Sequence, residues 1–326
     1  MIRRRTFLLA AFVAAGLSFA PGAEAAGTPK VVASFSILGD IVKQIGGNQI
    51  ELTTLVGPNG DAHVYQPTPA DARSVADADL VIVNGLGFEG WLDRLISAAG
   101  YKGELTVATA GLEAIKTDEE HENDEDHGSE KHADQAETDE HDDEHGHHHG
   151  ELDPHAWQSV ANIRTYVENV LAALTRIDPK NGEIYATNAK SYLSDLDALD
   201  AEIRASINML PESRRKVVTS HDAFGYFSRE YGITFLAPVG MSTESEASAG
   251  DVAKLIRQIK AEHIPAVFVE NITDKRLLEQ VARETNAVMG GTLYSDALSG
   301  QDEPASTYVK MMRHNYRSLT AALGAS

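Results

Sequence analysis

The feature that most constrains the fold is an alternation of short β-branched runs with amphipathic stretches, which occurs twice along the chain. This alternation is typical of α/β folds built on a mostly parallel sheet. We therefore expect two α/β lobes, each with its own mostly parallel sheet. The first set of predicted strands covers residues 30–36, 50–56, 79–85 and 104–110, and the second covers 215–220, 233–238, 266–271 and 290–295.

An unbroken helical pattern over residues 179–209 separates the two sets of strands. A helix of this length spans roughly 45 Å, which is about the length of a whole domain. We expect it to be a rigid linking helix (178–210) between an N-terminal lobe (27–177) and a C-terminal lobe (211–326). Periodicity alone is also compatible with one continuous α/β domain. Shorter helices are predicted at 37–45, 69–76, 88–98, 249–262, 274–285 and 305–322.

Residues 1–26 have the pattern of a secretory signal peptide. Three arginines precede the apolar run "TFLLAAFVAAGLSFA", and small residues follow at 23–25. The apolar run is shorter than the roughly 20 residues that a membrane span needs. "RRTFL" also resembles a twin-arginine export signal, so the export route is left open. We expect an exported protein, most simply a periplasmic one.

The sequence contains no cysteine. This absence excludes disulfides and thiolate metal ligands. It also removes the cysteine to which a lipid anchor would be attached. We therefore expect the mature protein to be free in the periplasm rather than tethered to a membrane.

Residues 117–150 form a loop with almost no apolar side chains. It contains fifteen Asp or Glu against one Lys, so it contributes −14 of the formal net charge of −21 and leaves −7 for the rest. Such a segment cannot form a core, and we expect it to be disordered. A passive acidic linker would not need histidines, whose imidazoles can bind metal weakly. The eight histidines of the loop are His121, His127, His132, His141, His145, His147, His148 and His149.

The overall acidity argues against nucleic acid or anionic lipid as a partner, because binding phosphate groups requires a basic face.

Five histidines lie outside the loop, and three of them hold informative positions. His63 and His221 follow predicted strands, and His155 opens a helix in "ELDPHAW". Asp296 also follows a predicted strand, although a helix N-cap is the simplest reading of this residue alone.

Ligands of open α/β sheets gather at the carboxyl ends of the strands, where these side chains are expected. Three imidazoles and one carboxylate form a good tetrahedral zinc site. Each histidine taken alone could equally be structural. The two remaining histidines, His263 at a helix end and His314 inside a helix, are interpreted as structural or solvent-facing.

Four motifs resemble those of the cluster A-I metal-binding proteins that serve ABC importers, especially the zinc proteins of the ZnuA kind. They are "GDAHVYQPTPAD", the His-rich insertion before "LDPHAW", "VVTSHDAFGYFSREYGI" and "GTLYSDALS". The resemblance covers the mature chain and implies His63, His155, His221 and Asp296 as metal ligands. It further implies a monomeric solute-binding protein that is not an enzyme and that delivers metal to an ABC permease. A periplasmic metallochaperone is a further candidate partner.

The resemblance also bears on the choice of metal. Manganese members of the family usually have a glutamate where this chain has His221, and three imidazoles favour Zn²⁺ over the harder Mn²⁺. Zn²⁺ is therefore the expected cargo, and the sequence leaves open whether Asp296 binds it directly. Two alternatives are a zinc hydrolase, with Glu270 or Asp222 as the base, and a periplasmic zinc buffer without a permease. Four protein ligands and the absence of an HExxH motif argue against the hydrolase.

Overall fold

The computed structural model describes residues 27–116 and 152–324. The expected signal peptide and the acidic His-rich loop lie outside the described residues. Among the described residues, no helix combines the length and the apolar character needed to cross a membrane.

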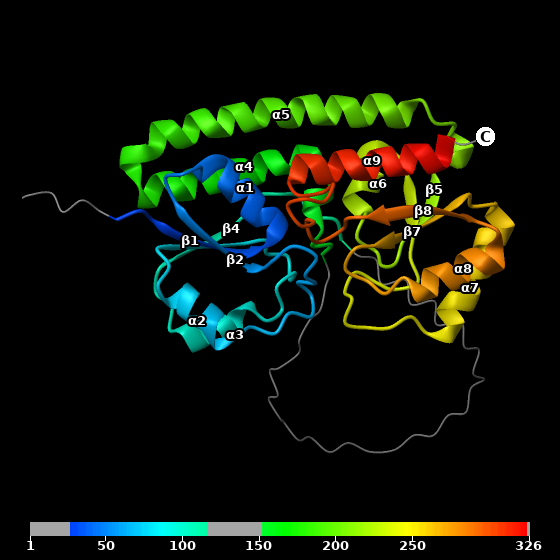
Figure 1. Cartoon of the computed structure of the whole chain (residues 1–326), viewed down its shortest axis with the longest axis horizontal. Coiled ribbons are helices and arrows are strands. Elements are labelled where there is room, and N and C mark those ends of the chain that lie inside the picture. Colours follow the sequence, from blue (N-terminus) through cyan, green and yellow to red (C-terminus); the bar gives the residue numbers. More distant parts are fainter. Residues whose placement is uncertain (1–26, 117–151, 325–326) are drawn as a thin grey trace, which may run out of the picture.

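The described residues form two separate four-stranded parallel sheets (Figure 1). The strand order is β2-β1-β3-β4 in the first sheet and β6-β5-β7-β8 in the second, so the two sheets have the same topology. This confirms the predicted fold class. The strands are β1 (Lys30–Phe35), β2 (Glu51–Val56), β3 (Leu80–Val83), β4 (Glu104–Val107), β5 (Lys216–Val218), β6 (Thr234–Leu236), β7 (Ala266–Glu270) and β8 (Val288–Leu293).

Helices cover both faces of each sheet, as parallel sheets require. The α-helices are α1 (Ser36–Gly46), α2 (Pro69–Ala76), α3 (Leu92–Ala99), α4 (Val160–Ile177), α5 (Gly182–Asn208), α6 (Gly225–Tyr231), α7 (Ala249–Glu262), α8 (Arg276–Thr285) and α9 (Tyr308–Gly324). The described part of the chain also contains the short 3₁₀ helices η1 (Ala156–Gln158), η2 (Pro179–Asn181) and η3 (Glu212–Arg214).

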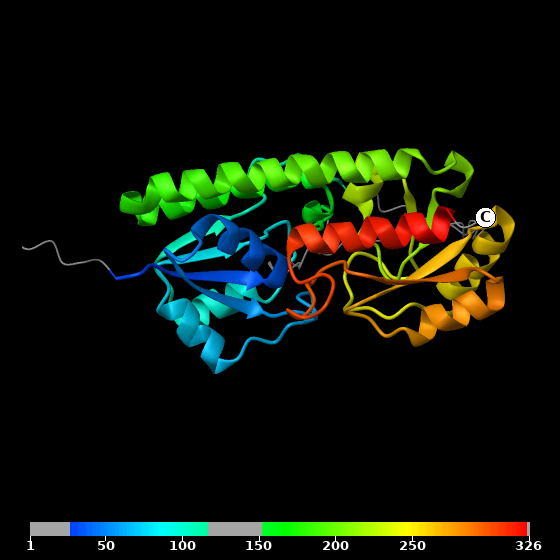
Figure 2. The same ribbon diagram turned by 45° about the horizontal axis from the view of Figure 1, so that its top comes forward.

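Helix α5 is the predicted linking helix, and it has 27 residues, or about 40 Å at the rise of an α-helix. It runs along both halves of the molecule, with α9 beside it (Figures 1 and 2). Tyr185, Tyr192, Leu199 and Ile203 recur at helical spacing on its buried face. This apolar stripe is what makes the helix pack onto the two halves.

The buried side chains beneath α5 form one contiguous apolar cluster that includes residues of β1, α4, α5, α6 and α9. A second, smaller cluster lies in the C-terminal half among Val218, Leu255, Val267 and Val281. The two sheets are therefore distinct, but much of their packing is shared. The expected boundaries of the lobes stay predictions.

The predicted elements agree with the structure to within a few residues. The predicted helices at 69–76 and 249–262 coincide with α2 and α7, and each begins after a capping side chain. Thr68 caps α2 in a capping box with Asp71, and Ser248 caps α7. Several predicted strands extend past the true strand ends into the loops that carry the candidate ligands.

Candidate metal centre

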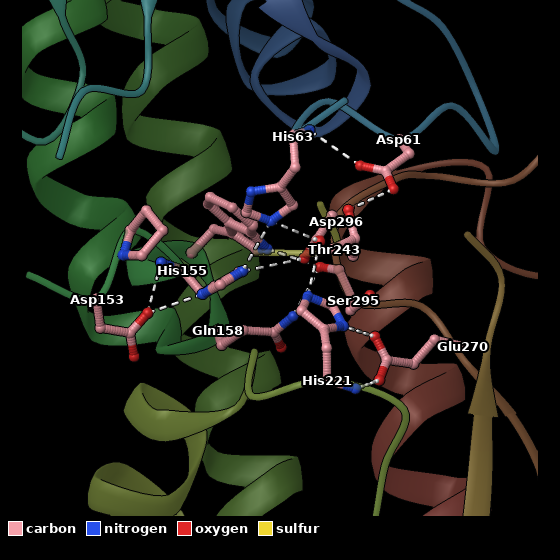
Figure 3. A network of polar contacts seen from close by, with 12 residues as sticks. Asp61, His63, Asp153, His155, Gln158, His221, Thr243, Glu270, Ser295 and Asp296 are labelled. Carbon is pink, nitrogen blue, oxygen red and sulfur yellow. Dashed lines mark hydrogen bonds and ion pairs between the residues drawn. The ribbon is translucent and has the colours of Figure 1, made fainter. Parts of the chain in front are cut away.

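The four predicted site residues lie on four different loops at the carboxyl ends of strands or at the start of a helix. His63 lies between β2 and α2, and His221 lies three residues after the end of β5. His155 immediately precedes η1, and Asp296 follows β8. The side chains converge on one another (Figure 3).

The candidate ligand atoms surround one point. All four atoms lie within 4.8 Å of one another. The Nε2 atoms of His63 and His155 are 3.3 Å apart. Asp296 Oδ2 lies 3.3 Å from His63 Nε2 and 3.1 Å from His221 Nε2. Asp296 Oδ1 lies 3.7 Å from His155 Nε2.

The separations of 3.1–3.3 Å among His63, His155, His221 and Asp296 Oδ2 are close to the edges of a tetrahedron around a small ion. With metal–ligand bonds of about 2.0–2.1 Å, the edge of a tetrahedron is roughly 3.3–3.4 Å. The donor set of three ring nitrogens and one carboxylate oxygen is also one that Zn²⁺ accepts. The carboxyl oxygens of Asp296 are buried and have no well-aligned hydrogen-bond donor among the described residues. A cation at this point would satisfy them.

Local hydrogen bonds hold two of these loops in shape. Asp61 Oδ1 accepts the backbone N–H of His63 at 2.9 Å, and Asp153 Oδ1 accepts that of His155 at 2.9 Å. In both cases the carboxylate lies two residues before the histidine and forms an Asx-type turn. His221 is fixed by Glu270, whose Oε1 accepts the backbone N–H of His221 at 3.0 Å.

The site is almost completely buried. His63 is 9% exposed, and His155, His221 and Asp296 are at most 1% exposed. The His63 ring packs against Phe88, with ring centroids 4.8 Å apart, and His155 packs against Trp157 at 5.3 Å. These aromatic rings exclude water, so charges within the site interact more strongly than they would in solvent.

The charges in the site shift the pKa values of two of its residues. Burial alone would lower the pKa of His221, but the carboxylates of Glu270 and Asp296 outweigh it and raise this pKa well above the usual value. Burial would raise the pKa of Asp296, but the neighbouring imidazoles of His221 and His155 lower it well below the usual value. The metal-free site thus favours a protonated His221 beside an ionised Asp296. A metal ion would take the place of the proton.

The loop between β6 and α7 separates two cavities that reach the site. The larger, of about 620 Å³, is lined by His221, Thr243 and Asp274, and the smaller, of about 340 Å³, by His63 and Met241. Thr243 Oγ1 donates a hydrogen bond of 2.7 Å to Asp61 Oδ2, so this loop is bonded to the loop that carries His63.

The structure keeps the two other described histidines out of the site. His263 ends α7 in the left-handed conformation, at φ 53°. The Nε2 of His314 lies 2.9 Å from the carbonyl oxygen of Thr292, and its ring packs against Tyr294. His263 is exposed and His314 is half-buried, and their interpretation as structural or solvent-facing residues stays a prediction. The eight loop histidines lie outside the described residues.

Three functional features of the site were not predicted from the sequence. One is Asp153, which lies 2.8 Å from the Nδ1 atom of His155. Its position in "LDPHAW" was the available signal, because an Asp before Pro often begins a turn. The second is the Thr243–Asp61 bond, and the third is the bonding of Trp157 and Gln158 to Ser295. These two features join residues more than 130 positions apart, and no local pattern marks such pairs.

The comparison with protein families identifies the class of protein. Residues 31–322 match the family described as "Zinc-uptake complex component A periplasmic". The chain belongs to this ZnuA-like family of periplasmic metal-binding proteins, which contains the substrate-binding components of cluster A-I metal ABC importers. The family works with ABC permeases, and its members are transporter components rather than enzymes.

The individual relatives differ in the metal that their names give. The manganese-binding lipoprotein MntA of Halalkalibacterium halodurans is 32% identical, over 97% of this chain and 96% of its own. The iron-binding protein YfeA of Yersinia pestis is 31% identical, over 90% of this chain and 86% of its own. The solved structure of the periplasmic zinc binding protein TroA from Treponema pallidum has a TM-score of 0.79 and 30% identity, and the match covers 91% of this chain and 99% of TroA.

Proposed function

We propose that this protein is a Zn²⁺ receptor that binds one ion through His63, His155, His221 and Asp296 and delivers it to an ABC permease. The observation that carries the proposal is the donor set of three imidazole nitrogens and one carboxylate oxygen, whose atoms all lie within 4.8 Å of one another. Asp296 Oδ2 lies 3.1–3.3 Å from the Nε2 atoms of His221 and His63. Imidazole favours Zn²⁺ over Mn²⁺, which prefers oxygen ligands. The proposal assigns Asp296 as a direct ligand.

The relatives' names include manganese, iron and zinc, so the names alone do not identify the metal that this protein binds. His221 is the residue that determines the preferred metal, because a carboxylate at this position would give a site of two nitrogen and two oxygen donors. Its burial and its close approach to Asp296 support a nitrogen donor aimed at the metal.

The best test is metal analysis of the native protein purified without chelator. We expect one Zn²⁺ per chain. A competition titration should then show that Zn²⁺ displaces Mn²⁺ at equal concentrations. If the protein is isolated with manganese or iron and keeps that metal in competition with zinc, the proposed specificity is rejected. The protein would still be a metal receptor.

We assign the eight histidines of the acidic loop an auxiliary role as weak zinc sites that collect the ion. Imidazoles on a chain that must be ordered around the ion bind weakly, because ordering costs conformational entropy. Isothermal titration of a variant lacking residues 118–150 should retain one tight site and lose the weak ones. Loss of the tight site would place the primary ligands in the loop instead.

The hydrolase alternative has little support. Four protein donors around one ion leave no open position for an activated water. Glu270, one of the two candidate bases, accepts two backbone N–H groups through Oε1 and pairs with the His221 ring through Oε2, so both of its oxygens are already engaged. That the receptor diffuses freely stays a prediction, because the relative MntA is named a lipoprotein. A metallochaperone as a partner also stays a prediction.

A further inference from the structure

Two of the candidate ligand histidines are backed by a buried carboxylate, but the two carboxylates are used differently. Glu270, at the end of β7, is 2% exposed. Its Oε1 accepts the backbone N–H groups of Ser220 at 2.7 Å and of His221 at 3.0 Å. Its Oε2 lies 2.6 Å from Nδ1 of His221. One oxygen of Glu270 therefore binds two backbone N–H groups, and the other lies against the ring nitrogen Nδ1 of His221 (Figure 3).

Asp153 supports His155 with a single oxygen. Its Oδ1 accepts the backbone N–H of His155 at 2.9 Å and lies 2.8 Å from the Nδ1 atom of the same residue. The other oxygen, Oδ2, takes no part in holding His155. An asparagine at this position could keep both contacts through its one carbonyl oxygen.

A glutamine at position 270 could not do the same. It has one acceptor oxygen and one donor NH₂ group, whereas the carboxylate of Glu270 meets donors on both sides. If the NH₂ group faced His221, Nδ1 would have to be the acceptor, and the ring proton would move to Nε2, the atom that faces Asp296. If the NH₂ group faced the two backbone N–H groups instead, buried donors would oppose each other, which is costly.

We propose that Glu270 is a positioning residue that fixes the tautomer of His221, holding the proton on Nδ1 and presenting the lone pair of Nε2 to the metal, and that only a carboxylate can do this. The proposal rests on the metal-binding function proposed above. The strand arrangement supports it, because β7 pairs with β5, which ends just before His221. The end of β7 thus delivers the carboxylate to the loop that carries this ligand.

The test compares Glu270→Gln with Asp153→Asn by chelator competition with Zn²⁺. Loss of an outer carboxylate partner typically costs about 10–100-fold in metal affinity. We expect a loss in this range for Glu270→Gln and a loss below about tenfold for Asp153→Asn. The surface variant Glu262→Gln, which removes a charge that pairs with Lys216, serves as the control with unchanged affinity. Equal losses in the two site variants would overturn the proposal.

A second readout does not depend on how the variants fold. Nitrogen-15 spectra of the imidazoles in the zinc-loaded wild-type protein should show His221 protonated at Nδ1 and coordinated through Nε2. Coordination through Nδ1 would overturn the proposal. A wild-type protein that binds no metal would instead reject the proposed function, so the two failures are distinguishable. Thermal unfolding of each variant without metal separates lost positioning from lost folding.

Discussion

The carbonyl oxygen of Ser295 accepts a hydrogen bond of 2.8 Å from the indole Nε1 of Trp157, and a second one of 2.8 Å from Nε2 of Gln158. Both donors belong to η1, directly after His155, and Ser295 directly precedes Asp296. A backbone atom of the C-terminal half is therefore bonded to the helical turn that follows a candidate ligand of the N-terminal half. This arrangement sets the distance between His155 and Asp296.

Removing both donors should cost more than the sum of the single losses. In Trp157→Phe or Gln158→Ala alone, the Ser295 carbonyl keeps one partner, and loss of a hydrogen bond lowers the free energy of unfolding by about 1 kcal/mol. In the double variant a buried carbonyl is left without a donor, which costs roughly 1–3 kcal/mol more. Denaturant unfolding of the four proteins measures the coupling. Strict additivity would show that losing the last donor to the Ser295 carbonyl carries no extra cost and would contradict the prediction.

Replacing His221 with glutamate should move the metal preference towards manganese. The variant offers two nitrogens and two carboxylates, so zinc affinity should fall by at least about tenfold, or roughly 1.4 kcal/mol. The new carboxylate would face Glu270, which lies 2.6 Å from the present ring. Adding Glu270→Gln should therefore improve manganese binding over the single His221→Glu variant. Competition titrations with Zn²⁺ and Mn²⁺ give both comparisons. An unchanged ratio of the Zn²⁺ and Mn²⁺ affinities would contradict the prediction from donor type.

Much of the fold could be predicted from the sequence, because apolar periodicity and capping residues are local signals. Helices α2 and α7 were predicted with their observed bounds, and both have capping side chains at their starts. The positions of the three histidines and Asp296 at strand or helix ends were also local features, and the structure brings all four together. The continuous core beneath α5 was not predictable, because periodicity identifies a buried face without identifying its partner.

The contacts that orient the candidate ligands were the least predictable part. Glu270 accepts the backbone N–H groups of Ser220 and His221, and no motif in the sequence marks this role. Its second contact, with the His221 ring, depends on the rotamers of two side chains, one at the end of β7 and the other on the loop after β5. For Asp296 alone, the simplest expectation was a helix N-cap. The structure shows no helix at residues 297–300, and the carboxylate points to the imidazoles.

Metal binding should release protons and weaken as the pH falls. In the metal-free protein, Glu270 and Asp296 outweigh burial and hold the pKa of His221 above 6.5. Below this raised pKa, a metal ion has to displace one proton from His221, so affinity should fall about tenfold per pH unit. Titration calorimetry in buffers of different ionisation enthalpy counts the released protons. A count of zero at neutral pH would contradict the raised pKa.

The same shifts predict how the stability of the metal-free protein depends on pH. A raised pKa means that His221 stabilises the fold fully below its unfolded value of about 6.5, and that this stability is lost as the pH rises through the higher folded pKa. The lowered pKa of Asp296 acts in the opposite sense, with stability present above about 3.8 and lost as the pH falls through the lower folded value. Zinc-free protein should thus lose stability towards alkaline pH, and His221→Gln should remove that loss. Unfolding curves between pH 5 and 10, measured with chelator present, check both expectations.

The bond between Thr243 and Asp61 should control how fast metal leaves. Thr243 lies on the loop that separates the two cavities, and its hydroxyl donates to the carboxylate that also accepts the backbone N–H of His63. Thr243→Val keeps the shape of the side chain but removes the donor, at a cost of about 1 kcal/mol, or roughly fivefold in rate. Zinc dissociation, followed by stopped-flow mixing with excess chelator, should accelerate by about this factor. Thr243→Ser keeps the hydroxyl and should dissociate at close to the wild-type rate. Equal acceleration in both variants would contradict a role for the hydrogen bond, because Thr243→Ser retains the donor.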